Sequence, residues 1–167
     1  LGNRQLGFMD TPGHARHHFC VYDSLSNSWF TGDTFGLSYR EFDTRNGAFI
    51  FPTTTPIQFD PAALKNSINK LVADDPDCMY LTHYGRVDEV QHLAVKMKEG
   101  VDILAEIAET YKNSAARRQK IEAAISDWLL QALAQHGVSL TQEKCLQILQ
   151  IDIELNTQGI EFWLDHR

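Results

Sequence analysis

Three histidines follow a Pro-Gly turn in the segment TPGHARHH at residues 11–18, and the first of them is His14. Further along the chain, Asp33 lies in a T-G-D-T segment and His83 in an L-T-H-Y-G segment. Imidazole nitrogens and carboxylate oxygens are common protein ligands of zinc. A metal ion held by such side chains activates water for hydrolysis. We therefore take these three residues as candidate metal ligands.

Each candidate ligand follows a segment with the composition of a β-strand. The three segments are rich in apolar, β-branched or aromatic residues and cover residues 5–9, 28–31 and 78–82. In an α/β architecture, loops that leave one edge of a sheet gather into one site. We therefore expect the three ligands, although distant in sequence, to meet at such an edge.

The remaining pattern of the first part predicts a hairpin, a long loop and a helix. Residues 19–22 and 28–31 flank a turn-forming stretch, which indicates antiparallel strands. Residues 34–59 show no clear period, and their aromatic side chains either shape an apolar substrate pocket or form loop core. Asp60 and Pro61 are typical of a helix N-cap and its first helical position.

Residues 88 to about 156 have helical spacing of apolar residues. Gly137 suits the end of a helix, and Ser139 followed by Gln142 resembles a capping box that opens the next helix. We expect two domains, with residues 1–95 forming the first and residues 96–167 a helical extension.

Taken singly, the three ligand signals are weak. A histidine in a loop is usually solvated or hydrogen-bonded, and a Gly-Asp pair is most often a turn. His17 and His18 are interpreted as structural neighbours of His14 rather than as ligands. The ordered set of three motifs is more specific than any one of them.

That ordered set resembles the second half of the metallo-β-lactamase superfamily, on its hydroxyacylglutathione hydrolase (glyoxalase II)-like side. The resemblance covers roughly residues 1–95 and rests on T-P-G-H-A-x-H-H, T-G-D-T and L-T-H-Y-G. It implies an α/β fold, namely the C-terminal half of an αββα sandwich followed by a helical extension.

The resemblance also implies roles for the candidate residues. His14 would complete a first metal position, Asp33 would bridge two metals, and His83 would complete the second. A hydroxide held by the metals would attack an ester, a thioester or a related bond. Zinc is the expected metal, as one or two ions in the complete enzyme, with iron and manganese as alternatives. Tyr84 either hydrogen-bonds a substrate oxygen, which would make it catalytic together with Asp33, or packs on its loop.

The superfamily's main ligand motif, H-x-H-x-D-H, does not occur in this sequence. Because the chain starts at Leu1, we expect it to be part of a longer enzyme or a fragment; the third explanation is a natural half that needs a partner chain. In each case these residues alone are expected to be inactive. The alternative function is a non-catalytic scaffold or dimerisation module with a degenerate metal site. An uncovered sheet face would favour a homo-oligomer.

Composition excludes several other classes of function. The net charge of −7 disfavours nucleic-acid binding, which needs a basic surface. No stretch approaches the ~20 apolar residues that span a bilayer, so we expect no membrane partner. Three widely spaced cysteines fit a reducing compartment, and we expect a cytoplasmic protein. The sequence contains no G-x-S-x-G nucleophile motif. A small-molecule substrate is the remaining expectation.

Overall fold

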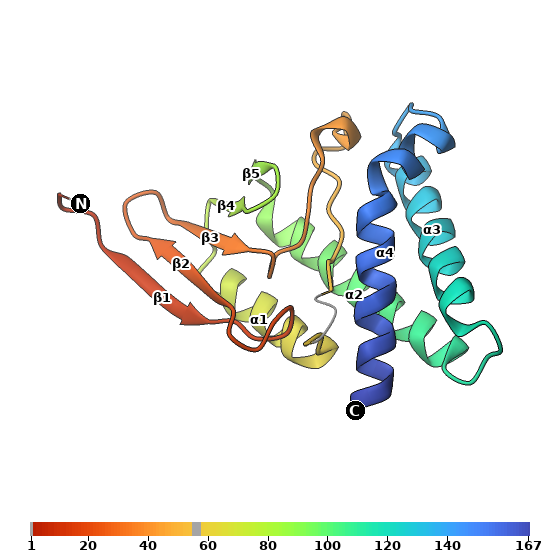
Figure 1. The fold of residues 1–167 in the computed structure, drawn as a ribbon. Coiled ribbons are helices and arrows are strands. Elements are labelled where there is room, and N and C mark those ends of the chain that lie inside the picture. Colours follow the sequence, from red (N-terminus) through yellow and green to blue (C-terminus); the bar gives the residue numbers. More distant parts are fainter. Residues whose placement is uncertain (1, 55–57) are drawn as a thin grey trace.

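A mixed five-stranded sheet organises the first part of the computed structural model, which describes residues 2–54 and 58–167 (Figure 1). Its strands, in both chain and sheet order, are β1 Leu6–Asp10, β2 Phe19–Asp23, β3 Ser28–Gly32, β4 Cys78–Leu81 and β5 Gly85–Val87. All neighbouring strands are antiparallel except β3 and β4, which are parallel. As a result, β1, β3 and β4 run in the same direction.

The α-helices of the described residues lie on one side of the sheet and beyond it (Figure 1). Their bounds are α1 Pro61–Val72, α2 Val90–Tyr111, α3 Arg117–His136 and α4 Gln142–His166. No helix in the described part of the chain is long and apolar enough to cross a membrane. The domain boundary expected after residue 95 falls inside α2. The division into two domains stays a prediction.

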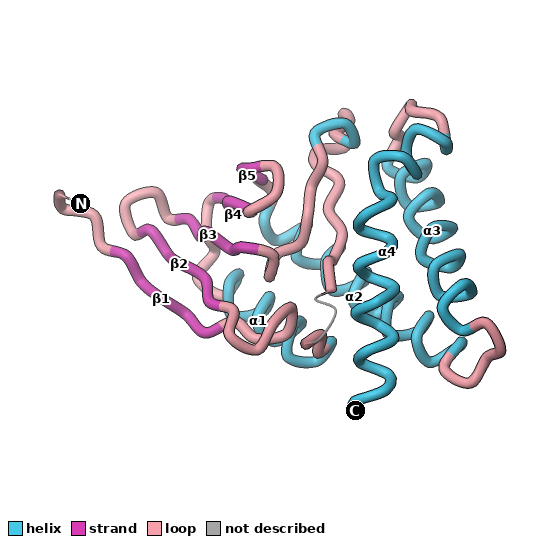
Figure 2. Tube along the Cα trace, viewed as in Figure 1, coloured by secondary structure: helices cyan, strands magenta, loops and turns pink. Residues whose placement is uncertain are grey.

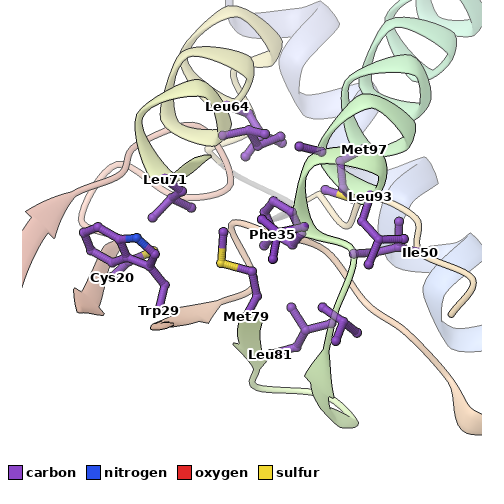
Figure 3. Packing of buried hydrophobic residues seen from close by; sticks show 14 of the residues in the cluster. Cys20, Trp29, Phe35, Ile50, Leu64, Leu71, Met79, Leu81, Leu93 and Met97 are labelled. Atoms are coloured by element: carbon purple, nitrogen blue, oxygen red, sulfur yellow. The ribbon is translucent and has the colours of Figure 1, made fainter. Parts of the chain in front are cut away.

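The main core lies between the sheet and the first two helices. Figure 3 shows Phe35 among Leu64 of α1, Met97 of α2 and Met79 of β4, and all four side chains are fully buried. A second cluster joins the loop after β3 to α2, α3 and α4. Trp163 of α4 packs against both clusters, so the helices and the sheet share a continuous apolar interior.

Most of the local sequence predictions are confirmed. The hairpin joins β2 to β3, Asp60 accepts a hydrogen bond from the Ala63 amide at the start of α1, and Gly137 ends α3 in the left-handed region. The prediction of a capping box at Ser139 is wrong. Thr141 caps α4 instead, because its hydroxyl accepts a hydrogen bond from the Lys144 amide. The last helix also extends to His166, beyond the expected end near residue 156.

The segment between β3 and α1 is a long loop that passes between the sheet and α4 (Figure 2). Its described residues include a short 3-10 helix, Arg40–Phe42, and an isolated bridge between Leu37 and Phe51. Of its aromatic side chains, Phe35, Phe42 and Phe51 are fully buried, so they belong to the core. Positions 55–57 of the 34–59 segment lie outside the described residues.

The other face of the sheet carries exposed apolar side chains. In the strand register, Phe8 of β1 lies opposite Val21 of β2, which lies opposite Phe30 of β3. Phe30 in turn stacks on Tyr80 of β4, with 4.9 Å between the ring centroids. Phe8 is 71% exposed and Phe30 45%. This row crosses four strands and forms an apolar patch of the kind that usually meets another protein layer.

Helix α1 holds the loop that carries His14. The Asp60 amide donates a hydrogen bond of 2.8 Å to the Gly13 carbonyl, and the Ser67 hydroxyl donates one of 2.6 Å to the Pro12 carbonyl. Gly13 has a φ of +130°, and a Cβ atom there would lie 2.1 Å from the Leu64 amide nitrogen. The loop and the helix can approach this closely only because residue 13 is glycine.

We predict that Gly13→Ala destabilises the protein by about 3 kcal/mol or more, because the added methyl group overlaps the backbone of α1 and the φ angle disfavours a side chain. Gly7→Ala is the matched control, since a Cβ at Gly7 would meet its nearest neighbour at 3.5 Å. Chemical denaturation of both variants measures the difference. Equal stability of the two variants would contradict the close packing of this loop on α1.

Candidate metal centre

The three candidate ligands converge because of the directions of their strands. His14 follows β1, Asp33 follows β3 and His83 follows β4, and these strands all end at the same edge of the sheet. The Asp33 carboxylate lies between the two imidazoles. Its Oδ2 is 3.7 Å from His14 Nε2, and its Oδ1 is 3.6 Å from His83 Nε2.

His14 is oriented by a backbone group of the long loop. Its Nδ1 lies 3.0 Å from the carbonyl oxygen of Thr53. Because a carbonyl only accepts hydrogen bonds, Nδ1 carries the proton, and in the neutral ring Nε2 directs its lone pair toward Asp33. Metal-binding histidines in proteins usually have this arrangement, in which the second ring nitrogen donates to a carbonyl or carboxylate.

His18 positions Asp33 through the backbone. The Asp33 amide donates a hydrogen bond of 3.3 Å to His18 Nε2, so the proton of this ring lies on Nδ1, 2.9 Å from the Thr34 hydroxyl oxygen. Gly32 has a φ of +52°, and a Cβ there would lie 2.4 Å from His18 Nε2. His17, by contrast, is exposed.

Short polar side chains bond to one another next to the loops that carry His14 and Asp33. The Thr11 hydroxyl lies 3.1 Å from Cys20 Sγ, and the Cys20 thiol donates to the Thr31 carbonyl at 3.3 Å. Burial raises the pKa of Cys20 to about 11, so the thiol stays protonated at neutral pH. Burial, together with the nearby His14, lowers the pKa of His18. Both groups are therefore neutral supports of the site.

Among residues 2–54 and 58–167, no three histidine, cysteine or carboxylate side chains gather closely enough to hold one ion by themselves. The structure does show two histidine–carboxylate pairs that share Asp33. Two atoms bound to one zinc ion at about 2.1 Å each lie no more than about 4.2 Å apart, so both pairs fall within this range. Asp33 Oδ1 is also buried without a hydrogen-bond partner in the described residues. The donor set of His14, Asp33 and His83 therefore fits part of a metal site, which would need further ligands.

The His83 side of the site is open. The His83 side chain is 51% exposed, and Tyr84 is 48% exposed. Tyr84 has a φ of +84°, which is rare and strained for a residue with a side chain. Its ring packs on Tyr39, with 4.5 Å between the ring centroids. The Tyr84 ring also lies 6.1 Å from the His83 ring, measured between the ring centroids.

Sequence reasoning identified only some of the residues that support the candidate ligands. The Thr53 carbonyl and Tyr39 lie in segments without a recognisable motif, and Thr34 lies in the T-G-D-T segment, where no role of its own was predicted for it. Every residue has a backbone carbonyl, so the residue type does not show which carbonyl is used. The bond from His14 to Thr53 also spans 39 positions. The adjacent histidines of the first motif were the available signal. They pointed to both His17 and His18, and of the two only His18 contacts Asp33, whereas His17 is exposed.

The match to a family model covers this site. Residues 1–83 match the model of the metallo-beta-lactamase superfamily. The matched segment includes His14, Asp33 and His83. Among curated proteins, none matches the chain significantly.

Solved structures support a metallo-beta-lactamase type of fold. An archaeal metallo-beta-lactamase superfamily protein from Sulfolobus tokodaii is 20% identical, with a TM-score of 0.56 over 95% of this chain. A metallo-beta-lactamase family protein from Thermus thermophilus is 15% identical, with a TM-score of 0.53 over 90% of this chain. The chain spans 46% of the length of each of these two proteins.

We predict that His18→Ala lowers the free energy of unfolding by about 1–3 kcal/mol, because the partly buried Asp33 amide loses its partner and the Thr34 hydroxyl loses one of its partners. His17→Ala serves as the control and should change it by less than about 0.5 kcal/mol, since the side chain is exposed. Urea denaturation in the presence of a chelator measures both. Equal losses in the two variants would show that His18 does not support Asp33.

The lowered pKa of His18 predicts a pH dependence of stability. Unfolded histidine takes up a proton near pH 6.5, whereas the folded state does so at lower pH. The contribution of His18 is therefore fully present above about pH 6.5 and is lost as the pH falls toward the folded pKa. The stability difference between wild type and His18→Ala, measured with a chelator, should shrink between about pH 7.5 and about pH 5.5. A constant difference would contradict this assignment.

Proposed function

We propose that His14, Asp33 and His83 form part of the metal centre of a metal-dependent hydrolase that cleaves an ester, a thioester or a related bond. The observation that carries the proposal is the Asp33 carboxylate between two imidazole Nε2 atoms, at 3.6 Å and 3.7 Å. Zinc is the proposed metal, with iron or manganese as alternatives. Bound metal ions would supply Lewis acidity and a water-derived nucleophile at neutral pH.

The residues of the chain have separate roles in this proposal. Asp33 would be shared between the two metal positions and is catalytic in that sense, while the imidazoles of His14 and His83 would each complete one position. The exposed phenol of Tyr84, beside His83, would hydrogen-bond a substrate oxygen. His18 would position Asp33 by accepting a hydrogen bond from the Asp33 backbone amide.

We further propose that these residues alone form an incomplete catalyst. Each metal position has one histidine and the shared carboxylate, which is fewer ligands than zinc requires. The missing ligands would come from a further segment of the same protein, arranged as the other half of an αββα sandwich. That half would also cover the exposed face with Phe8 and Phe30. The 46% coverage of both matched structures is consistent with a second half of similar length.

The proposed substrate is a small molecule in the cytoplasm, and the glyoxalase II-like motifs make a thioester the first choice. The net charge of −7 disfavours a nucleic-acid substrate. Cys20, Cys78 and Cys145 are all free and buried, as suits a reducing compartment.

The alternative function is a non-catalytic module, and the exposed sheet face is the observation in its favour. In that case a second copy of the chain would cover Phe8, Phe19 and Phe30. Light scattering of Phe8→Ser distinguishes the two functions. A wild-type dimer that this substitution dissociates supports the module, whereas a wild-type monomer supports a face reserved for the rest of the hydrolase.

We predict that the chain binds zinc weakly and that Asp33→Asn lowers its affinity by at least about tenfold, because the amide is a poorer ligand than the carboxylate. Titration against a chromophoric chelator measures the affinity. The matched control is Asp74→Asn, which should retain the wild-type value. Asp74 is exposed and precedes β4, whereas His83 follows that strand.

If Asp33→Asn binds zinc as tightly as wild type does, the proposed metal centre is wrong. If wild type shows no binding, the same comparison is made in a longer protein that carries these residues and an H-x-H-x-D-H segment. The absence of metal there, or of hydrolysis of thioester and phosphoester substrates, would contradict the hydrolase.

A further inference from the structure

Helix α4 buries polar side chains on the face that it turns toward the rest of the protein. Asp152, Asn156 and Thr157 are 5%, 0% and 0% exposed, whereas Ile151 on the same helix is 69% exposed. Buried polar groups are costly unless they are hydrogen-bonded, so their partners show what they stabilise. Asp152 and Asn156 are four positions apart and therefore lie on the same side of the helix.

Asn156 binds the segment that orients His14. Its Oδ1 accepts a hydrogen bond of 2.7 Å from the Thr54 amide, and its Nδ2 donates one of 3.3 Å to the Pro52 carbonyl. Both bonds go to the backbone, on either side of Thr53. The Thr53 carbonyl is the group that faces His14 Nδ1 at 3.0 Å. The amide of Asn156 thus holds the peptide that selects the protonated nitrogen of His14.

Asp152 supports the loop at the other end of the site. Its Oδ2 accepts a hydrogen bond of 2.7 Å from the Tyr39 hydroxyl, and the Tyr39 ring packs on Tyr84. Tyr84 directly follows His83 and has a strained backbone. The pKa of Asp152 is raised above its ordinary value, mainly by burial. The Tyr39 hydrogen bond and the nearby His83 partly offset this effect.

We propose that α4 positions the metal ligands, with Asn156 holding the His14 loop through Pro52 and Thr54, and Asp152 holding the His83 loop through Tyr39 and Tyr84. The proposal rests on the proposed metal centre for its effect on metal affinity. Its structural part concerns the protonation of His14 and the surroundings of His83, and it does not depend on a metal. In this view the last helix is a component of the site, whose positioning residues touch no ligand directly.

The first test is the protonation of the His14 ring, measured by nitrogen NMR on the chelator-treated chain. In wild type the ring should carry its proton on Nδ1. In Asn156→Ala the segment around Thr53 loses both hydrogen bonds to the Asn156 side chain and keeps only those from the Thr54 hydroxyl to the backbone carbonyls of α4. A substantial fraction of His14 should then carry the proton on Nε2. If Asn156→Ala does not fold, Asn156→Asp replaces it, because the carboxylate keeps the acceptor for Thr54 and loses the donor to Pro52.

Thr157→Val is the matched control. Thr157 is buried beside Asn156, but its hydroxyl binds only the Ile153 carbonyl of its own helix. This variant perturbs the buried polar face of α4 without touching either ligand loop. It should therefore leave the protonation of His14 unchanged.

The second test is zinc affinity. Asn156→Ala, or Asn156→Asp in its place, should bind zinc about 10- to 100-fold more weakly than Thr157→Val, as is typical when the partner of a metal-binding histidine is lost. Tyr39→Phe should weaken zinc binding in the same direction and shift the NMR signals of His83, whereas Asp152→Asn, which keeps an acceptor for Tyr39, should retain most of the affinity.

The proposal is overturned if wild-type His14 carries its proton on Nε2, or if the Asn156 variants match Thr157→Val in His14 protonation. The Asp152 part is overturned if Tyr39→Phe leaves the His83 signals unchanged. Failure of the metal centre has a different signature, since Asp33→Asn would then bind zinc as wild type does while the Asn156 variants still alter His14.

Discussion

The site depends on one constraint, the common direction of β1, β3 and β4. A hairpin reverses the chain between β2 and β3, and the crossover through α1 brings β4 back parallel to β3. Because the three strands end at the same edge, the loops that follow them must meet there. The close packing of α1 against the Gly13 loop then determines how near His14 can come to Asp33.

Bringing ionisable groups together at this edge has an energetic cost that the neighbouring polar groups reduce. The Asp33 amide is bonded to His18, and His14 to the Thr53 carbonyl, so each backbone or ring group has a defined partner. The exception is Asp33 Oδ1, which is buried without a hydrogen bond in the described residues. A buried carboxylate oxygen in this condition is unfavourable unless a cation approaches it, which is why the geometry suits a metal.

Helix α4 connects the helical part of the chain to the sheet and to the loop beside His14. Trp163 of α4 packs against both apolar clusters, and the buried amide of Asn156 connects the same helix to the loop beside His14. The opposite face of the sheet, with Phe8 and Phe30 exposed, has no such support within the described residues. Within the described residues, the sheet is thus packed on the side of the helices, while its other face carries exposed apolar side chains.

The local elements could be predicted from the order of residues alone, whereas the role of His14, Asp33 and His83 as metal ligands stays a prediction. The Asp60-Pro61 cap, the Gly137 stop and the hairpin depend on residues close together in the chain, and they were predicted correctly. The prediction of a cap at Ser139 was wrong because the helix begins at Gln142, directly after Thr141, whose hydroxyl accepts a hydrogen bond from the Lys144 amide. The surroundings of the ligands, by contrast, depend on how the whole chain packs. The Thr53 carbonyl reaches His14 across 39 positions and Asn156 reaches Thr54 across 102, and such contacts follow from packing rather than from any local pattern.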